Sequence, residues 1–296
     1  LLNEAARLTA EEYCTFHATL PGAFFCLGLC SGRLAASDAL ALQQLFVEEC
    51  AGVLFGAAQG GPAPLPPPTL RVTAPVHHLL ELPAPGGKRS SAVFLGFFAQ
   101  KGAEALLLLL EQLLAPLLFD ALRTNEQLCY ALGCRAVSAP EGLLLGLAME
   151  SEALPVARCA ARLKRFLADV RADVAGLSRS DFERLRQGAL AQLTQPFANG
   201  QAEHAFFAEL LLACSRDFDK RARLAAETRA LSPEALLAGF DALFAAERRF
   251  LVEVRFVAAG RRGAKRAKLG CGPTETAESL RERLVFDAPS PPCDSD

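Results

Sequence analysis

The sequence predicts an α+β fold in which helices pack on one face of a mostly antiparallel sheet. Strand-like segments precede a long helix, and a strand pair, more helices and a final strand follow, an order typical of helices segregated to one face. The strands do not alternate one by one with helices, as they would in a doubly wound parallel sheet. Hydrophobic residues make up 51% of the 296 residues and charged residues 22%, so the chain can bury a large core.

The sequence pattern of the N-terminal segment predicts a helix, a strand and a second helix, in that order. Thr9 and Glu12 have the spacing of a capping box, which opens the first helix. The apolar and aromatic run Ala23–Cys30 has the length of a strand. Ser37 can cap the second helix, over 38–55. This segment therefore has the elements of an α+β domain on a smaller scale.

A segment rich in glycine and proline, Gly60–Pro68, marks a domain boundary because such a sequence is extended and semi-rigid. We therefore divide the chain into residues 1–60, the end of one domain; 61–69, a linker; 70–258, a second domain; and 259–296, a flexible tail.

Patterning within the second domain predicts its elements in order. Strands are expected over 70–74, 77–82, 91–100, 127–136, 143–151 and 250–258. Helices are expected over 103–115, 155–174, 178–196, 201–214 and 232–245. Proline fits a helix best in its first turn, so Pro116 is expected to start a further short helix.

Charge and hydropathy exclude two classes of partner. The formal net charge is -2, without the excess of cations that a general nucleic-acid binder needs. The most apolar stretch, Ala103–Phe119, contains Glu104, Glu111 and Pro116 and is shorter than the ~20 apolar residues of a membrane span. We expect a buried helix there, no membrane partner and no nucleic-acid partner.

Ten cysteines are scattered without a C-x-x-C pair, mostly inside apolar runs. Reduced, buried thiols are typical of a protein inside the cell, so the expected localisation is cytoplasmic, or organellar within the cell. Because the sequence begins at Leu1, we also expect it to be part of a longer polypeptide.

The histidines do not predict a metal site. The segment H-L-L-E-L at 78–82 resembles the zinc motif H-x-x-E-H, but Leu82 stands where the second histidine belongs. His77 and His78 point to opposite faces of a strand and cannot both bind one ion. His17 and His204 lack a second ligand at suitable spacing. We expect no metal ligands in this chain.

The segment L-R-T-N-E-Q-L-C-Y, over 122–130, combines Arg123 at a helix end with Tyr130 at the start of a strand. Arginine and tyrosine are donors that can hold a carbonyl or an oxyanion. The alternative is a surface ion pair between Arg123 and Glu126, with Tyr130 packed in the sheet.

This segment resembles the motif L-R-T-x-E-Q-L-G-Y of the insulinase family of zinc metallopeptidases, which includes insulin-degrading enzyme, nardilysin and pitrilysin. It agrees at every specified position except Cys129, where the family has glycine. The surrounding sequence is also similar, at F-F-A-Q over 97–100, E-G-L-L-L-G-L-A-M-E-S over 141–151 and D-F-D over 217–219. The likeness extends over about 9–258.

The resemblance implies four homologous α+β domains in two bowl-shaped halves that enclose a chamber. The zinc motif H-x-x-E-H lies in the first domain of such proteins, so zinc would be bound by an N-terminal half outside this chain. Residues 1–60 would end the third domain and 70–258 would form the fourth. Arg123 and Tyr130 would contact substrate, with the Tyr130 hydroxyl near the scissile carbonyl as transition-state donor. A side chain at Cys129 is expected to alter the packing beside Tyr130.

The expected function is thus the C-terminal, non-zinc-binding half of an insulinase-like zinc metalloendopeptidase. It would close the chamber and bind peptide substrates, with the N-terminal half of the same polypeptide as partner and a homodimer as a further candidate assembly. One alternative is an inactive family member or processing-complex subunit that binds peptides without cleaving them. Another is an unrelated α+β interaction domain. Retention of both Arg123 and Tyr130 favours the peptidase.

Overall fold

The computed structural model describes residues 9–19, 29–32, 34–54, 69–72, 76–84, 89–99, 102–139, 142–212, 215, 217–245, 250–257 and 284–287. The chain forms two compact units. The first consists of Leu1–Pro66 and Pro196–Phe218, and the second consists of Pro67–Gln195 and Asp219–Asp296.

The first unit contains the helices α2 (Ala10–Thr19), α3 (Ala36–Leu54) and α7 (Gly200–Leu212). The capping box at the start of α2 is confirmed, since Thr9 Oγ1 accepts from the Glu12 N–H and the Glu12 carboxylate accepts from the Thr9 N–H at 2.9 Å. Helix α7, expected in the second domain, groups with this unit. The strand expected at 23–30 and the linker at 61–69 lie largely outside the described residues. The assignment of the two parts to a third and a fourth domain stays a prediction.

The second unit is built on a five-stranded sheet, with strand order β2-β6-β3-β5-β4. Its strands are β2 (Val76–Pro83), β3 (Ser91–Ala99), β4 (Ala131–Ala139), β5 (Gly142–Ser151) and β6 (Phe250–Val257). The pair β2–β6 is parallel and all other neighbours are antiparallel. A separate antiparallel ladder joins β1 (Thr69–Val72) to β7 (Leu284–Asp287), which falls in the segment expected to be a flexible tail.

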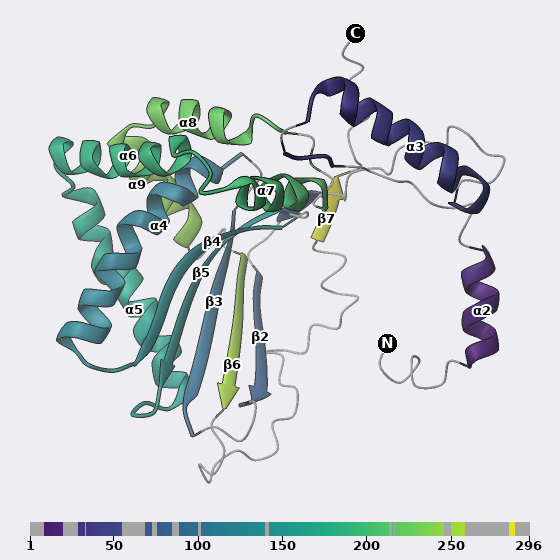
Figure 1. Ribbon diagram of the computed structural model, residues 1–296. Helices are drawn as coiled ribbons and strands as arrows, with labels where there is room; N and C mark the ends of the chain where they lie inside the picture. The colour runs from purple at the N-terminus through teal and green to yellow at the C-terminus, as the bar shows by residue number, and fades with distance from the viewer. Residues whose placement is uncertain are drawn as a thin grey trace. The chain divides into compact units, whose positions relative to one another are not determined.

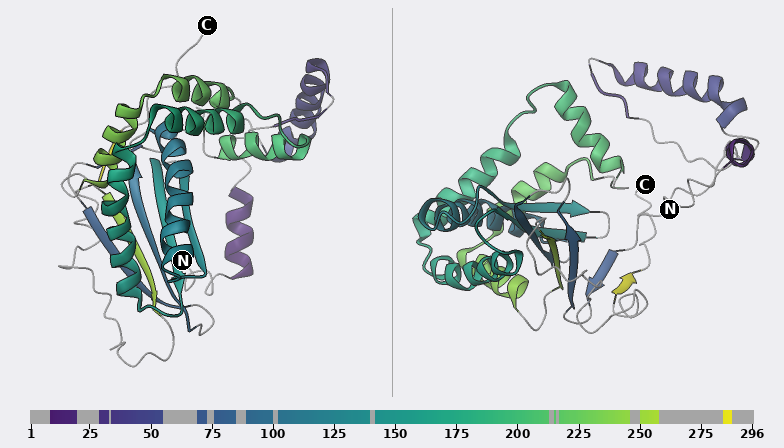
Figure 2. Two further views of the ribbon diagram at one scale, coloured as in Figure 1. Left: turned by 90° about the vertical axis from the view of Figure 1, so that its left-hand side faces the viewer. Right: turned by 90° about the horizontal axis from the view of Figure 1, so that it is seen from below.

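Helices cover one face of this sheet (Figure 1). Contacts with the strands come from α4 (Glu104–Phe119), α5 (Val156–Ala175) and α9 (Pro233–Phe244), while α6 (Arg179–Thr194) and α8 (Lys220–Ala230) pack on α4. Figure 2 shows the helices layered against the strands from two further directions. The expected fold class, helices packed on one face of a mostly antiparallel sheet, is confirmed.

The core lies between the sheet and these helices, and its fully buried side chains include Leu95, Phe97, Leu145, Leu147, Leu109 and Leu114. By length and composition alone, one helical stretch of the described residues, Glu104–Asn125, could cross a membrane. In the structure its leucines contact the core: Leu107, Leu109, Leu110, Leu114, Leu118 and Leu122 are buried, and Leu106, Leu108, Leu113 and Leu117 are half-buried. The stretch therefore serves as the central core helix of the fold.

The other side of the sheet, which we call the second face, carries Phe94 and Phe98 on β3. Their rings lie over glycines of β5: a Cβ built on Gly146 would be 2.5 Å from the Phe94 ring, and one built on Gly142 would be 2.2 Å from the Phe98 ring. A side chain at either position would therefore have to displace a ring. The second face therefore presents half-buried aromatic rings.

Three local predictions need correction. Pro116 does not start a helix but lies inside α4, which continues into a π-helix, η3 (Asp120–Asn125). An internal proline costs ~3 kcal/mol, and burial of Leu114, Leu118 and Leu122 around it offsets that cost. Strand β4 begins at Ala131 rather than at Gln127. Helix α8 was not expected, because its sequence is dominated by arginine and alanine and few of its side chains are buried.

Candidate functional site

The motif segment forms the end of the helical layer and the turn into β4. Arg123 is exposed on η3, with its guanidinium 5.3 Å from the centre of the Phe119 ring. The preceding residue, Leu122, is fully buried and anchors the π-helix in the core. Arg123 is thus held at the surface with its donors available to a ligand.

A tight turn then leads to the tyrosine. Gln127 has φ 53°, in the left-handed region. The Leu128 N–H donates to the Leu122 carbonyl at 2.9 Å, and the buried Ser151 hydroxyl donates to the Leu128 carbonyl at 2.5 Å. These bonds fold the segment back on the helix, so the tyrosine precedes β4 and is not part of the strand.

Tyr130 is 50% exposed, and its partner Glu150 lies on the same face of β5 as Gly146, the second face of the sheet. Its N–H donates to the Glu150 carbonyl at 3.3 Å, and its hydroxyl donates to the Glu150 carboxylate. Ser90 also donates to that carboxylate, at 2.5 Å. The hydrogen bond to Glu150 raises the pKa of Tyr130, so the hydroxyl keeps its proton and remains a donor at neutral pH.

Cys129, where the related motif has glycine, is half-buried. It packs against the core, with Sγ 4.0 Å from the Leu122 carbonyl oxygen. Burial raises the pKa of the Cys129 thiol, which makes it a poor nucleophile. The cysteine fills space under the turn while Tyr130 stays half-exposed.

One part of the alternative interpretation, a surface ion pair between Arg123 and Glu126, is wrong. Glu126 binds Arg162 of α5 through two donors instead. Neither this partner nor Glu150 is near the motif in sequence, and no local signal in the sequence could identify them.

The histidines expected not to form a metal site have other contacts. His77 Nε2 lies 2.9 Å from a carboxylate oxygen of Glu253, and His204 Nδ1 lies 2.7 Å from the Ser31 hydroxyl. His78 is half-buried on β2, and the His17 side chain lies outside what the structure describes. Among the described residues, no group of three or more histidine, cysteine, aspartate or glutamate side chains could hold a metal ion.

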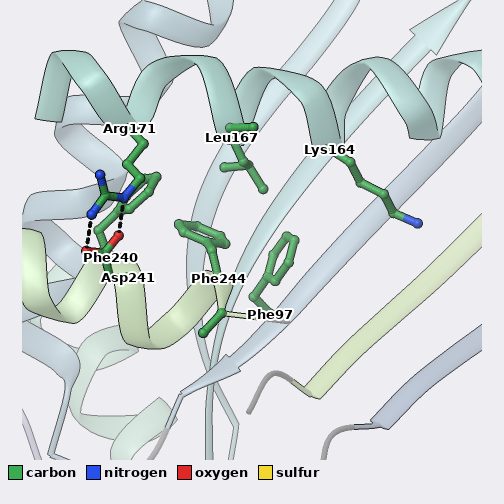
Figure 3. Close-up of a pocket in the computed structure, with 9 residues that line it drawn as sticks. Phe97, Lys164, Leu167, Arg171, Phe240, Asp241 and Phe244 are labelled. Carbon is green, nitrogen blue, oxygen red and sulfur yellow. Dashed lines mark hydrogen bonds and ion pairs between the residues drawn. The ribbon is translucent and has the colours of Figure 1, made fainter. Parts of the chain in front are cut away.

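A cavity of about 390 Å³ lies between α5 and α9, and no motif residue lines it. Its floor consists of the Phe97, Phe240 and Phe244 rings together with Leu167. Figure 3 shows the ion pair between Arg171 and Asp241 at one side of these rings and Lys164 at the other. The charged groups on its rim are already paired, so the cavity offers no free donor or acceptor for chemistry.

Comparisons with known proteins agree with the family resemblance of the motif. Residues 109–207 match the family model described as PQQ synthase PqqF-like, C-terminal lobe domain 4. No curated protein matches the sequence.

Solved structures share the fold. Pitrilysin matches with a TM-score of 0.68 and 18% identity, over 87% of this chain and 27% of its own. The periplasmic protease PqqL from Escherichia coli matches with a TM-score of 0.54 and 15% identity, over 75% and 26%. The peptidase M16 inactive domain from Pseudomonas fluorescens matches with a TM-score of 0.53 and 13% identity, over 86% and 59%. The chain thus spans about a quarter of the length of pitrilysin and of PqqL. The predicted resemblance to the C-terminal half of insulinase-type (M16) peptidases is therefore confirmed, by the fold and by the family model over residues 109–207.

Proposed function

We propose that this chain is the C-terminal, non-zinc-binding half of an insulinase-like zinc metalloendopeptidase. The observation that carries the proposal is the placement of Arg123 and Tyr130. Both are exposed, on a segment held rigidly by buried hydrogen bonds, and both belong to the motif that resembles the family's substrate-contacting segment. The second face, with Phe94 and Phe98, would then form part of the wall that closes the chamber.

The described residues do not fit a zinc ion, since they supply no cluster of ligands. By the resemblance to the insulinase family, zinc would be bound by the N-terminal half of the same polypeptide, the expected partner of this chain. The contribution of this chain is to bind and to orient the peptide.

Arg123 would donate to backbone carbonyls of the peptide, because its planar guanidinium offers several donors in a fixed fork. Tyr130 would donate to the carbonyl oxygen that becomes negatively charged in the transition state. Its hydroxyl already binds a carboxylate, Glu150, so it is oriented toward negative charge before substrate arrives. Binding of the peptide would exchange Glu150 for the developing oxyanion as acceptor.

The test uses the complete polypeptide with a peptide substrate. Tyr130→Phe should lower kcat by roughly 10²–10³ with little change in KM, since it removes a donor used in the transition state. Arg123→Ala should raise KM as well. Both variants should retain the zinc content of the parent. Cleavage by Tyr130→Phe within about twofold of the parent would show that the residue only packs.

The second candidate is an inactive family member that binds peptides without cleaving them. The likeness to the M16 inactive domain favours it, since that protein shares the fold over 86% of this chain. The sequence upstream distinguishes the two, because only a peptidase requires an intact H-x-x-E-H. A homodimer also remains a proposal.

We keep the cytoplasmic or organellar localisation as a proposal as well. Cys14, Cys30, Cys129 and Cys134 carry free thiols, in keeping with a reducing compartment. Fractionation of cells that express the complete protein would test it, and recovery outside the cytoplasm and organelles would contradict it.

A further inference from the structure

Glu126 is the charged motif residue that the proposed function leaves unused. Its carboxylate oxygens accept from Nε of Arg162 on α5 at 2.8 and 3.1 Å, and Nη2 of the same guanidinium also donates to it. The Arg162 side chain is only 20% exposed, so the pair is partly shielded from solvent. The hydrogen bonds of Arg162 hold the pKa of Glu126 below its usual range. The pair therefore stays charged at neutral pH and, as a guanidinium–carboxylate fork, fixes orientation as well as distance.

Glu126 stands at the point where the motif leaves the helical layer. Its own N–H donates to the Ala121 carbonyl at 3.1 Å, with the spacing of a π-helix. The next residue, Gln127, is the one non-glycine residue with positive φ among those that the structure describes. A non-glycine residue in the left-handed region costs roughly 1–2 kcal/mol and persists only where its surroundings enforce it. The ion pair lies directly before this strained residue.

The far end of the same turn is fixed as well. Leu128 is bound at both its N–H and its carbonyl, and the Tyr130 N–H and hydroxyl both bind Glu150. The turn is therefore hydrogen-bonded to β5 at one end and to α5 at the other, and the hydrogen bonds that the described residues show to α5 come from the pair Glu126–Arg162.

We propose that Glu126 and Arg162 are positioning residues: their ion pair ties the turn 126–130 to α5 and thereby sets where Tyr130 places its hydroxyl. Without the pair, Gln127 can relax out of the left-handed region, and Tyr130 moves away from Glu150. The positional part concerns this chain alone, and only its consequence for catalysis rests on the proposed function.

The composition of the chain offers a direct readout. It contains two tyrosines, Tyr13 and Tyr130, and no tryptophan. In a Tyr13→Phe background the ultraviolet absorbance of tyrosinate reports the ionisation of Tyr130 alone. Because the bond to Glu150 raises the pKa of Tyr130, a displaced hydroxyl should titrate closer to the ordinary value of about 10. Circular dichroism at each pH confirms that the chain is folded.

In this background, Glu126→Gln and Arg162→Ala should both lower the pKa of Tyr130. Arg162→Ala removes most of a side chain and could disturb folding. Glu126→Gln keeps the size of the side chain, so it tests the same ion pair without that risk. The matched control is Arg171→Ala, which removes a bidentate pair with Asp241, at 2.7 Å, from the same helix without touching the motif. Arg171→Ala should leave the titration of Tyr130 unchanged. The double variant Glu126→Arg with Arg162→Glu reverses the two charges of the pair and should restore the raised pKa of Tyr130 at least in part. An unchanged titration in Glu126→Gln, or an equal shift in Arg171→Ala, would overturn the proposal.

The catalytic consequence is measured in the complete polypeptide. Glu126→Gln should lower kcat about 10- to 100-fold, with KM within about twofold of the parent. Arg171→Ala should retain the parent's kcat. If the parent protein cleaves no peptide, the proposed function fails while the titration still decides whether the pair positions Tyr130. If the parent cleaves and Glu126→Gln keeps full kcat, the catalytic consequence of the positioning is refuted.

Discussion

Replacing Glu253 by glutamine should destabilise the second unit by about 2–3 kcal/mol. Glu253 lies on β6 and is fully buried, on the face of the sheet that the helices cover. Its carboxylate accepts from Lys164 Nζ on α5 at 2.6 Å and from Arg255 Nε at 2.6 Å, and it lies 2.9 Å from His77 Nε2 on β2. A single carboxylate therefore joins one helix to two strands.

The size of this effect follows from the exposure of the partners. Breaking a fully buried ion pair costs ~3–5 kcal/mol, because the remaining charge is left without a partner in a low-dielectric site. Here Lys164 and Arg255 are 32% and 19% exposed, so water can solvate part of the charge that the substitution leaves. Glutamine also retains an oxygen that accepts one hydrogen bond. These two effects place the loss below the full value for a buried pair.

The pH dependence has a definite sign. Burial by itself raises the pKa of Glu253, but the hydrogen bonds and charges of Lys164 and Arg255 outweigh it and hold the pKa below its ordinary range. A lowered pKa in the folded state means that the stabilisation is present above the unfolded value of about 4.3 and is lost as pH falls through the folded value. The difference between the parent and Glu253→Gln should therefore shrink as the pH falls below about 5.

Urea denaturation followed by circular dichroism measures the free energy of unfolding, and the melting temperature should fall by about 4–12 °C. The control is Glu81→Gln, which removes the other partner of Arg255, at 3.0 Å and near the surface. That pair is half-exposed and should contribute less than about 1 kcal/mol. Equal effects of the two substitutions, or a loss below about 0.5 kcal/mol in Glu253→Gln, would refute the argument that burial makes this carboxylate important.

Three further outcomes are expected. Gly146→Ala should cost about 1–3 kcal/mol by urea denaturation, because the new Cβ would lie 2.5 Å from the Phe94 ring, whereas Gly133→Ala, with nothing within 4 Å, should be nearly neutral. Glu150→Gln should lower the pKa of Tyr130 in the absorbance titration, and an unchanged value would mean that the hydroxyl binds elsewhere. The isolated chain should hold no stoichiometric zinc and hydrolyse no peptide, because the part of the chain that the structure describes supplies no cluster of ligands. One tightly held zinc per chain by elemental analysis would contradict this prediction.

The sequence by itself determined the elements whose signals are local. The capping serines Ser178 and Ser232 open α6 and α9 where expected, each accepting an N–H three residues on. The apolar alternation of β3 places Leu95 and Phe97 in the core. Local signals suffice here because caps and strand periodicity are set by residues within one turn or one pleat. The same holds for the motif at 122–130, recognised from its residues alone.

Only the tertiary structure decided how that motif is held. The partner of Glu126 is 36 residues away in the sequence, on α5, and the groups that meet Glu253 come from as far as 176 residues. The position of Pro116 inside α4 was also decided by tertiary packing. Burial of the surrounding leucines outweighs the local preference against a proline in a helix interior. Such contacts depend on which elements the fold brings side by side, and a charged side chain has several candidate partners until packing leaves one within reach.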